Sequence, residues 1–593
     1  PPPPPPRLPP DNPMNTLALE SPTAPMPPLS RRGLSLRERI GQTCQVHAGF
    51  MAGWSEGQVE DYFGCHPVGG IFIGGEVIGV SADTDKASAL RDRIALFRRI
   101  SMNTTGVPLA VAGDLENGAG GAVRGLTAFP NMMALGAAGD ADAAYEYGRW
   151  TALEACATGF NWCLGPVADL SLNWLNPVVN LRSLGSDPRQ VARLLDALIR
   201  GMQDHGLSAT AKHFPGDGVD FRDQHLCLSI NSLDETAWRR TFGAVFRRCI
   251  ESGVHAIMAG HIALPWRDAR TRDGCRDGMP IPATVSQPIL TDLLRGELGF
   301  DGVLISDALI MAGFTGWADR ERRLIEAFNA GIDVMLWPGD DYFDLIERAL
   351  ADGRISEKRL DESVARVLAL KSRQADVAGN PADTSHCRPA TQVGITATDA
   401  AAFARQLGQR SLTLLRNRAS VLPLAPDRAR RVCVVVASIR DDENALAIAE
   451  PLLARLRARG CEVTVQVNGN CLDLTRREEA GERFDALIAL FEQSIHGQKN
   501  TMRPTAAPAE CMWMLQGLAT MRPVIVSLGS PYLLHDMPWA DTCINAYGSS
   551  RFSLEALDAA LFGEKPFTGS CPVDAGGEWL TPANRCSPIA PCP

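Results

Sequence analysis

The sequence lacks any uninterrupted apolar run of the roughly 18 to 20 residues that a membrane-spanning helix needs. It also lacks an excess of basic residues, since 58 Lys and Arg against 68 Asp and Glu give a formal net charge of −10. Such a surface repels phosphate backbones, so we expect neither a membrane nor a nucleic acid as partner. With 45% hydrophobic and 21% charged residues, the 593-residue chain has the composition of a soluble globular protein of two or three domains.

The 16 cysteines include no CxxC pair, the spacing that zinc ribbons and redox motifs require. No secretory apolar segment stands near the start, so we expect a cytoplasmic protein whose cysteines act as small buried hydrophobes. The chain begins at Pro1, which leaves open whether Met14 or an upstream segment provides the start.

Four common functional motifs are also absent. The Gly-rich GAGGAVRG at residues 118–125 lacks the GxGxxG spacing, and the sequence has no Walker lysine loop. It contains neither HExxH nor the GxSxG elbow. Phosphate-cradling and serine-hydrolase functions therefore have little support.

Composition and periodicity predict an α/β protein with two structured domains. In residues 34–375, short apolar β-branched runs such as GVLIS alternate with amphipathic helical stretches, and eight strand candidates predict a (β/α)₈ TIM barrel. A doubly wound sheet is the main rival. Five strand candidates in residues 396–580 predict a smaller, open α/β sandwich domain. The remaining segments are a disordered Pro-rich segment at 1–33, a linker at 376–395 and an irregular tail at 581–593.

Polar residues follow several predicted barrel strands at their carboxyl ends, where such barrels place their active sites. They are Asp114, Glu116, Asp169, Lys212, His213, His261 and Asp307. A single charged residue at a strand end is more often a loop ion pair or a helix cap. Their recurrence at one end of the barrel favours an active site.

Asp307 stands between the apolar runs GVLIS and ALIMAGF. A carboxylate there is poorly solvated unless a cation lies beside it, and Lys212, Arg182 and Arg124 are the candidates. A buried structural salt bridge is the alternative interpretation.

The second feature is the segment KHFPGDGVDFRDQHLCLSI, in which Pro215, Gly216 and Gly218 predict a tight, mobile loop. It carries Asp223 and His225 in a D-x-H arrangement. An Asp beside a His can fix the imidazole tautomer and favour its charged form, as a general acid/base requires. On a surface this pattern means little, but at a barrel mouth it indicates catalysis.

KHFPGDG with the following DQH, DGVLISDALIMAGF and NPVVNLRSLGSDP resemble glycoside hydrolase family 3, and within it the β-N-acetylhexosaminidases. The likeness runs from about Ile40 to Val573, and SVLPL and AYGSS…ALFGEKPFTGSCPV fit the family's C-terminal sandwich. The resemblance implies a retaining hydrolase that removes terminal non-reducing β-N-acetylglucosamine through a covalent glycosyl-enzyme intermediate.

The resemblance also implies the roles of individual residues. Asp307 would be the nucleophile, and the Asp223–His225 dyad would be the acid/base. The residues that it assigns to the glycone subsite are Asp114, Arg182, Lys212, His213 and Arg124. It implies no metal and no cofactor, a carbohydrate as partner, and a monomer or weak homodimer. The natural substrate would come from cell-wall recycling or from chitin.

Three positions depart from the family pattern. Asp217 stands where the subgroup often has a histidine, Ala308 follows Asp307 where SDD or SDW is usual, and NGAGGAVR replaces GGR. The alternatives are a β-glucosidase of the same family, an N-acetylglucosaminide phosphorylase and an inactive sugar-binding protein. Trp54, Trp174 and Trp266 offer faces for sugar stacking, although core or loop packing is favoured for each.

Overall fold

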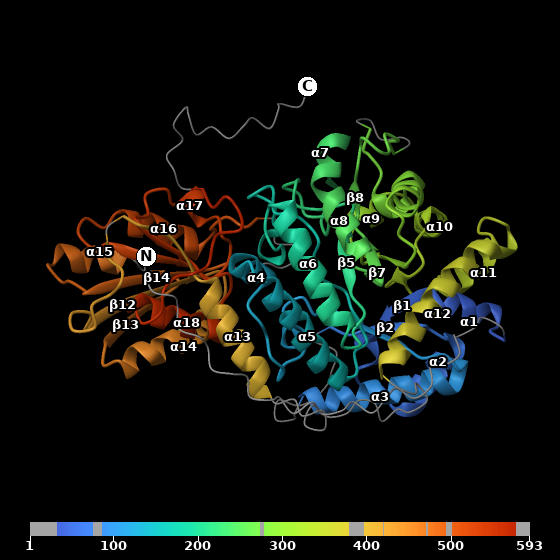
Figure 1. The fold of residues 1–593 in the computed structure, drawn as a ribbon, viewed down its shortest axis with the longest axis horizontal. Coiled ribbons are helices and arrows are strands. Elements are labelled where there is room, and N and C mark those ends of the chain that lie inside the picture. The colour runs from blue at the N-terminus through green and yellow to red at the C-terminus, as the bar shows by residue number, and fades with distance from the viewer. Residues whose placement is uncertain are drawn as a thin grey trace, which may run out of the picture.

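The computed structural model describes residues 33–74, 86–272, 278–378, 397–418, 420–469, 472–493 and 501–576. They form two α/β domains that lie side by side, a barrel and a smaller sandwich (Figure 1). Most of the predicted N-terminal segment and linker, and the whole predicted tail, lie outside the described residues. Helix α12 (Glu357–Ala378) runs through residues 376–378, the first three of the predicted linker.

Within the described residues, eight parallel strands of the first domain close into a barrel. Strands β10, β1, β2, β3 and β4 pair in that order, and β5, β7 and β9 pair in a second group. Backbone hydrogen bonds join the groups on both sides, from Cys163 N to Ser208 O at 2.8 Å and from Ser306 N to Val334 O at 3.0 Å. Closure confirms the predicted (β/α)₈ fold and excludes the doubly wound sheet. The strands are β1 (Cys44–His47), β2 (Gly70–Phe72), β3 (Ala110–Gly113), β4 (Trp162–Cys163), β5 (Thr210–Phe214), β7 (Ala256–Ala259), β9 (Val303–Ser306) and β10 (Met335–Leu336).

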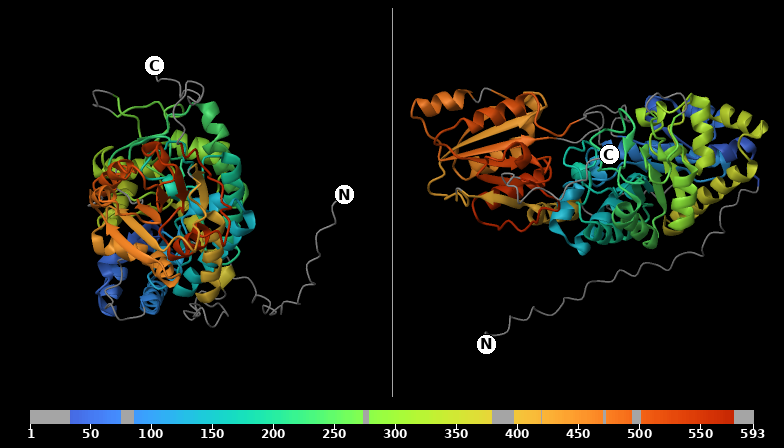
Figure 2. Two further views of the ribbon diagram at one scale, coloured as in Figure 1. Left: turned by 90° about the vertical axis from the view of Figure 1, so that its left-hand side faces the viewer. Right: turned by 90° about the horizontal axis from the view of Figure 1, so that it is seen from above.

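Helices cover the outside of the barrel (Figures 1 and 2). Besides α12, they are α1 (Leu36–Gln42), α2 (Glu56–Cys65), α3 (Lys86–Thr105), α4 (Met132–Ala138), α5 (Ala141–Thr158), α6 (Pro188–Gln203), α7 (Glu235–Arg240), α8 (Phe242–Glu251), α9 (Ala312–Thr315), α10 (Arg320–Ala330), α11 (Tyr342–Ala351) and the π-helix η5 (Pro288–Glu297). The short strands β6 (Ser229–Ile230) and β8 (Ile262–Ala263) pair with each other after β5 and β7.

Alternation along the strands separates two apolar layers, as the period of two in a strand requires. In β7, Ala256 and Met258 belong to the cluster inside the barrel, whereas Ile257 packs in the outer layer between strands and helices. Strand β9 repeats this pattern, with Val303 inside and Leu304 outside. Side chains therefore fill the barrel interior, and a ligand can enter only at the ends of the strands.

Helix α6 shows how local sequence fixes the outer layer. Asp187 caps its first turn by accepting from Arg189 N at 3.0 Å, and Pro188 occupies the first helical position, where it needs no hydrogen-bond partner. Helices α5 and α6 then pack closely because glycines face each other's backbone. A Cβ at Gly148 would lie 2.3 Å from Leu198 O, so no larger residue fits this crossing.

The second domain is a six-stranded sheet in the order β11-β16-β15-β14-β12-β13, covered by helices on both faces. Its pairs are parallel except for the edge strand β11, which is antiparallel to β16. The five predicted strands are all present, and β11 is additional. The strands are β11 (Thr413–Asn417), β12 (Arg431–Ser438), β13 (Glu462–Val467), β14 (Ala486–Glu492), β15 (Pro523–Ser527) and β16 (Thr542–Asn545). The helices are α13 (Ala397–Ser411), α14 (Asp442–Ala458), α15 (Leu472–Glu479), α16 (Ala507–Gln516), α17 (Leu533–Asp536) and α18 (Arg551–Leu561).

The two domains meet along one side of the barrel, where α13 packs on α4 and α5 (Figure 2). The contact combines an apolar cluster, which includes Met133 and Tyr547, with polar bonds. Arg410 pairs with Asp140 at 2.6 Å, and the Tyr532 hydroxyl lies 2.7 Å from Ser171 Oγ. The sandwich therefore stabilises the loops that follow barrel strand β4.

Among the described residues, none of the helices combines the length and the apolarity that crossing a bilayer demands. The same residues include eleven cysteines, and none of these is in a disulfide. Six of the eleven thiols are buried, including Cys44 and Cys163 in the barrel, as expected for cysteines that pack as small apolar side chains.

Lys371 of α12 provides a test of packing at the amino-terminal end of the barrel. Its ammonium is buried and donates to Gln42 Oε1 at 2.6 Å and to Gly69 O at 2.7 Å. Burial lowers the pKa of Lys371 from 10.5 to about 7. Between about pH 7 and 10 the unfolded chain binds more protons than the folded one, so folding stability rises with pH by up to ~1.4 kcal/mol per unit.

Lys371→Met should remove this part of the pH dependence, because methionine cannot titrate. Lys358→Met, at an exposed position of the same helix, should leave it unchanged. The measurement is the thermal midpoint of wild type and both variants from pH 7 to pH 9.5. Equal pH slopes for Lys371→Met and wild type would show that Lys371 stays charged in the folded protein.

Candidate active site

A cavity of about 280 Å³ lies at the carboxyl ends of the barrel strands. It is lined by Phe72, Asp114, Leu164, Arg182, Lys212, His213, His225, Met258, Asp307, Ala308, Ile310, Met311, Leu336 and Trp337. One part of this lining is charged and another is apolar. The volume suits a single small polar ligand such as one sugar ring.

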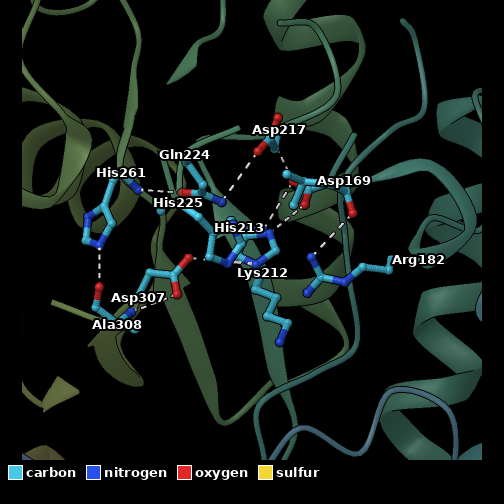
Figure 3. Close-up of polar contacts among 12 residues, drawn as sticks. Asp169, Arg182, Lys212, His213, Asp217, Gln224, His225, His261, Asp307 and Ala308 are labelled. Atoms are coloured by element: carbon cyan, nitrogen blue, oxygen red, sulfur yellow. Dashed lines mark hydrogen bonds and ion pairs between the residues drawn. The ribbon is translucent and has the colours of Figure 1, made fainter. Parts of the chain in front are cut away.

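Asp307 follows β9 directly, and its side chain is 13% exposed. Its Oδ1 accepts from Ala308 N at 2.8 Å, and its Oδ2 lies 3.9 Å from His213 Nε2 (Figure 3). Burial alone would raise the pKa of Asp307, but His213, His261 and the Ala308 N–H outweigh it, so the pKa is lowered. Asp307 is therefore an ionised carboxylate that faces the cavity at neutral pH.

His213 is held from behind by a second, fully buried carboxylate. Asp169 Oδ2 lies 2.7 Å from His213 Nδ1, and Asp169 Oδ1 accepts from the backbone N–H groups of His213 at 3.2 Å and Asp217 at 2.8 Å. With Nδ1 occupied, the Nε2 edge of the ring is directed at Asp307 (Figure 3). Asp169 thus orients His213 without lining the cavity.

Lys212 and Arg182 meet carboxylates on the other side of the cavity. The Lys212 ammonium lies 2.9 Å from Asp114 Oδ1 and 2.6 Å from Glu116 Oε1. Arg182 holds Glu116 through two parallel bonds of 2.8 and 2.9 Å. Burial raises the pKa of Glu116, but Arg182 and Lys212 more than offset it and hold this pKa well below the usual range. Asp114 is 56% exposed and is the carboxylate of this group most open to a ligand.

A register shift in β5 brings two consecutive side chains to the cavity. Lys212 pairs with Met258 and Phe214 with Ala259, so His213 is the extra residue on its strand. In a regular strand, adjacent side chains point to opposite faces, whereas a bulge re-aims one of them. Lys212 and His213 therefore both line the cavity.

The predicted dyad is formed. Asp223 is buried, its Oδ1 lies 2.6 Å from His225 Nδ1, and the same oxygen accepts from His225 N at 2.8 Å. The His225 side chain is 29% exposed and lines the cavity with Asp307. Because Asp223 holds Nδ1, Nε2 is the nitrogen that can exchange a proton with a ligand.

The loop that carries the dyad is tight, as predicted, and its first part is packed against the barrel. Residues 214–218 are buried, and Gly218 has a positive φ of 105°, with no room for a Cβ because Leu170 O would lie 2.0 Å away. Gln224 O accepts from Gly313 N and His225 O accepts from Ala312 N, both at 3.1 Å. The dyad is therefore fixed to the segment that follows Asp307.

The structure does not bring every predicted residue to the cavity. Arg124 is exposed in the loop after β3, and its backbone forms an isolated β-bridge with Leu126. It does not line the cavity.

The structure places none of the three candidate cations beside Asp307. Lys212 pairs with Asp114 and Glu116, and Arg182 pairs with Glu116, whereas histidines lie around Asp307.

None of the three tryptophans considered for stacking lines the cavity either. Trp54 packs on Phe50 and Tyr62, Trp174 stacks on His535 at 4.6 Å, and Trp266 packs on Trp238. Each makes the packing contacts that the sequence favoured.

Several lining residues escaped the sequence analysis. Trp337, which follows β10, packs edge-on against Phe72 at 5.1 Å and forms an aromatic wall. Ile310 and Met311 form an apolar wall after Asp307. All three residues follow barrel strands. A search of the strand ends for apolar as well as polar residues would have found them.

A larger depression of about 430 Å³ lies beside α10, but its charges are already paired. Arg270 binds Asp268, and Arg322 binds Glu326 at 2.7 Å. In the described part of the chain, no three His, Cys, Asp or Glu side chains gather as metal ligands would. The smaller cavity, with its facing carboxylate and imidazoles, is the candidate active site.

Fold and cavity together define a class of protein. A (β/α)₈ barrel whose strand ends present an ionised Asp307, a histidine held by Asp223, and paired charges can perform nucleophilic and acid–base chemistry on a small polar ligand. Figure 3 shows Asp307, His213, His225, Lys212 and Arg182 close together, and all five line the cavity.

Residues 35–370 match the model for the N-terminal domain of glycosyl hydrolase family 3, and the chain belongs to this family. It is 35% identical over 532 residues to a β-N-acetylglucosaminidase/β-glucosidase of Cellulomonas fimi, which covers 86% of this chain and 90% of that protein. The chain is thus a family 3 enzyme that acts on glycosidic bonds.

Two solved structures are similar over both domains. A family 3 β-N-acetylglucosaminidase from Paenibacillus sp. str. FPU-7 has a TM-score of 0.77 and 27% identity, covering 91% of this chain and 99% of that one. A β-glucoside phosphorylase has a TM-score of 0.78 and 26% identity, covering 92% and 95%. These matches agree with the two-domain architecture.

Asp217, one of the positions expected to depart from the family pattern, provides a second test of a buried ionisable group. It is buried beside Asp169 and accepts from Asn176 Nδ2 at 2.9 Å and Gly218 N at 2.6 Å. Burial and the Asp169 charge raise the pKa of Asp217 from 3.8 to about 7. The folded state then binds more protons than the unfolded state between about pH 4 and 7, so this group's stabilising contribution is lost as pH rises through about 7.

The stability of Asp217→Asn relative to wild type should therefore increase as pH rises from 5 to 8. The readout is the difference in thermal midpoint between the variant and wild type at each pH. Asp301→Asn, at an exposed position, is the matched control and should show a constant difference. A difference for Asp217→Asn that stays constant with pH would contradict the raised pKa.

Proposed function

We propose that the chain is a retaining β-N-acetylglucosaminidase that removes terminal non-reducing N-acetylglucosamine from oligosaccharides or muropeptides through a covalent intermediate. The observation that carries this proposal is the placement of an ionised Asp307 and the Asp223–His225 pair at one cavity. The activities named for the Cellulomonas and Paenibacillus relatives support it.

In the first step, an Asp307 oxygen attacks the anomeric carbon while the bond to the aglycone oxygen breaks. His225 Nε2 gives its proton to that oxygen, and Asp223 stabilises the positive imidazolium that precedes the transfer. The products of this step are a glycosyl ester of Asp307, a neutral His225 and the free aglycone.

In the second step, neutral His225 takes a proton from water as the water oxygen attacks the anomeric carbon. The bond to Asp307 breaks, which releases the sugar with its original anomeric configuration and restores the starting charges. One histidine serves in both directions because it first loses and then regains a proton.

The charged side of the cavity suits the glycone. Asp114, Arg182, Lys212 and His213 present donors and acceptors that their neighbours already hold in place, so they lose little freedom when sugar hydroxyls bind. Arg124 lies outside this set.

The three alternative functions differ in how well the structure supports them. A β-glucosidase of this family would draw its acid/base from the second domain, but every described residue that lines the cavity belongs to the barrel. Phosphorolysis has one specific observation in its favour, because a neutral histidine does not repel phosphate as a carboxylate would, and one structural neighbour is a phosphorylase. An inactive sugar-binding protein is disfavoured because nucleophile and dyad are both present.

A reducing, cytoplasmic compartment with a role in cell-wall recycling remains part of the proposal. Its support is the eleven cysteines of the described residues, none of which is in a disulfide. Chitin oligosaccharides are the alternative source of substrate.

The deciding experiment compares 4-nitrophenyl β-N-acetylglucosaminide with 4-nitrophenyl β-glucoside, each with and without phosphate. We expect faster turnover of the first substrate and free N-acetylglucosamine as product. Faster turnover of the glucoside favours the glucosidase, a sugar phosphate identifies a phosphorylase, and binding without turnover identifies an inactive protein.

The third prediction concerns Asp307. Asp307→Asn should lower turnover by at least about 10³-fold, because an amide cannot form the glycosyl ester, while the thermal midpoint changes little. Wild type treated with an activated 2-fluoro sugar should gain one glycosyl mass, whereas Asp307→Asn should not. Asp301→Asn is the matched control and should be labelled like wild type. Ordinary turnover in a pure Asp307→Asn sample would remove Asp307 as nucleophile.

The fourth prediction separates the two residues of the dyad. His225→Ala should be most harmful when the leaving group is another sugar, and far less harmful with nitrophenol, whose oxygen needs little protonation. On a disaccharide substrate, Asp223→Asn should lower kcat/KM less than His225→Ala does, because Asp223 orients and stabilises the ring without transferring the proton. The measurement is kcat/KM of each variant on both substrates. Equal losses for His225→Ala on both would assign the histidine to binding.

A further inference from the structure

Two histidines from neighbouring segments line the cavity together. His213 belongs to β5, and His225 stands further along, on the loop that carries the dyad. In the proposed function, on which this inference rests, His213 binds the glycone and His225 transfers the proton. Both rings must therefore keep fixed places around one sugar, because a displacement of about 1 Å can cost about 10²-fold in rate.

Asp217 is bonded to the His213 side of the cavity. Its backbone N–H donates to Asp169 Oδ1 at 2.8 Å, and the other oxygen of Asp169 lies 2.7 Å from His213 Nδ1. The Asp217 side chain is buried, and its Oδ1 accepts from Asn176 Nδ2 at 2.9 Å and from Gly218 N at 2.6 Å. Its Oδ2 remains for a donor from elsewhere in the fold.

Gln224, the residue between Asp223 and His225, supplies that donor. Its buried side chain accepts from His261 N at Oε1, at 2.9 Å, and its Nε2 lies 3.4 Å from Asp217 Oδ2 (Figure 3). Because a backbone N–H can only donate, the bond from His261 identifies the oxygen end of the carboxamide, and the NH₂ group must face Asp217. The carboxamide therefore joins the start of the loop to the dyad.

The surroundings of Gln224 are closely packed. A Cβ at Gly260, which follows β7, would lie 2.9 Å from His213 Cβ and 3.3 Å from Gln224 Oε1, so no larger residue fits there without displacing His213. On the other side, Gln224 O accepts from Gly313 N at 3.1 Å, in the segment that follows Asp307. Gln224 is thus the residue at which the segments of both histidines and of Asp307 meet.

We propose that Asp217 and Gln224 are positioning residues, whose donor–acceptor contact fixes the place of His225 in the cavity. Neither residue is among those that line the cavity, so both act through other side chains rather than on the substrate. Gln224 directly precedes His225, and Asp217 anchors it to the turn that holds His213. When the contact is lost, the step that suffers is the one that needs the proton of His225.

Asp217→Asn removes the acceptor and keeps the size of the side chain. The oxygen of the new amide can still accept from Asn176 and Gly218, but its NH₂ group then faces the NH₂ group of Gln224. We expect kcat/KM for the N-acetylglucosamine disaccharide to fall about 10-fold, and that for the 4-nitrophenyl glycoside to fall far less, because only the disaccharide depends on the proton of His225. Both are measured at pH 8, above the Asp217 pKa of about 7, where the wild-type carboxylate is ionised.

The double variant Asp217→Asn/Gln224→Glu exchanges donor and acceptor. The new carboxylate can accept from both the new amide and His261 N, so every group of the wild-type contact again has a partner. This exchange should recover most of the activity lost on the disaccharide. A role in stability alone would recover the thermal midpoint without changing the ratio of the two kcat/KM values.

Gln374→Glu is the matched control for a carboxylate placed at a buried glutamine. Gln374 lies in α12 and donates to Asn161 O and Ser208 Oγ, both at 3.1 Å, at the amino-terminal end of the barrel. This variant should lower the thermal midpoint, while the ratio of kcat/KM on the two substrates stays at the wild-type value.

Two results would overturn the positioning role: an unchanged ratio in Asp217→Asn, and a double variant no better than the single one. Should Asp217→Asn not fold, Gln224→Met removes the donor instead and must change the ratio in the same direction for the role to stand. Failure of the proposed function is distinguishable, because equal losses for His225→Ala on both substrates contradict proton transfer by His225 itself. When His225→Ala shows unequal losses and Asp217→Asn does not, only the positioning role fails.

Discussion

The site depends on placing a positive charge almost completely out of water. The Lys212 side chain is only 3% exposed, and an ammonium at such a position is stable only between carboxylates. Asp114 and Glu116 supply them from the loop after β3, and Glu116 in turn binds Arg182 from the loops after β4. One buried charge therefore ties three strand ends together and sets the geometry of the glycone side.

The same reasoning explains why the opposite side of the cavity uses imidazoles. As the proposed nucleophile, Asp307 needs a polar neighbour that lowers its pKa without forming a tight salt bridge, because a tightly paired carboxylate is a poor nucleophile. His213 at 3.9 Å meets this requirement, and buried Asp169 keeps it in position. In the proposed mechanism, the strong pairs bind substrate, while the weaker contact leaves Asp307 reactive.

Sequence reasoning predicted the barrel because every strand pattern and most strand-end polar residues are local signals. It placed Asp223 with His225 for the same reason, since only Gln224 separates them. It could not identify Asp169 as the partner of His213, because that contact joins residues 44 positions apart and depends on barrel closure. Strand β11 escaped because TLLRN is short and mixed in polarity. Arg124 was misplaced because the loop after β3 leaves its side chain exposed and outside the cavity lining, which the sequence does not show.

The second domain has a role that the cavity itself does not reveal. Its Tyr532 contacts Ser171, and its Ser530 Oγ lies 3.3 Å from Asn180 Nδ2 of the barrel. Asn180 stands two residues before Arg182. Arg182 is the residue that holds Glu116, so the sandwich supports the glycone side through the backbone of one barrel loop. In the proposed mechanism the second domain supplies no carboxylate to the reacting carbon, because the dyad is carried by the barrel and bonded to the segment after Asp307. In the proposed mechanism, a second domain that supports binding without supplying the acid leaves proton transfer to the barrel, to which every described residue lining the cavity belongs.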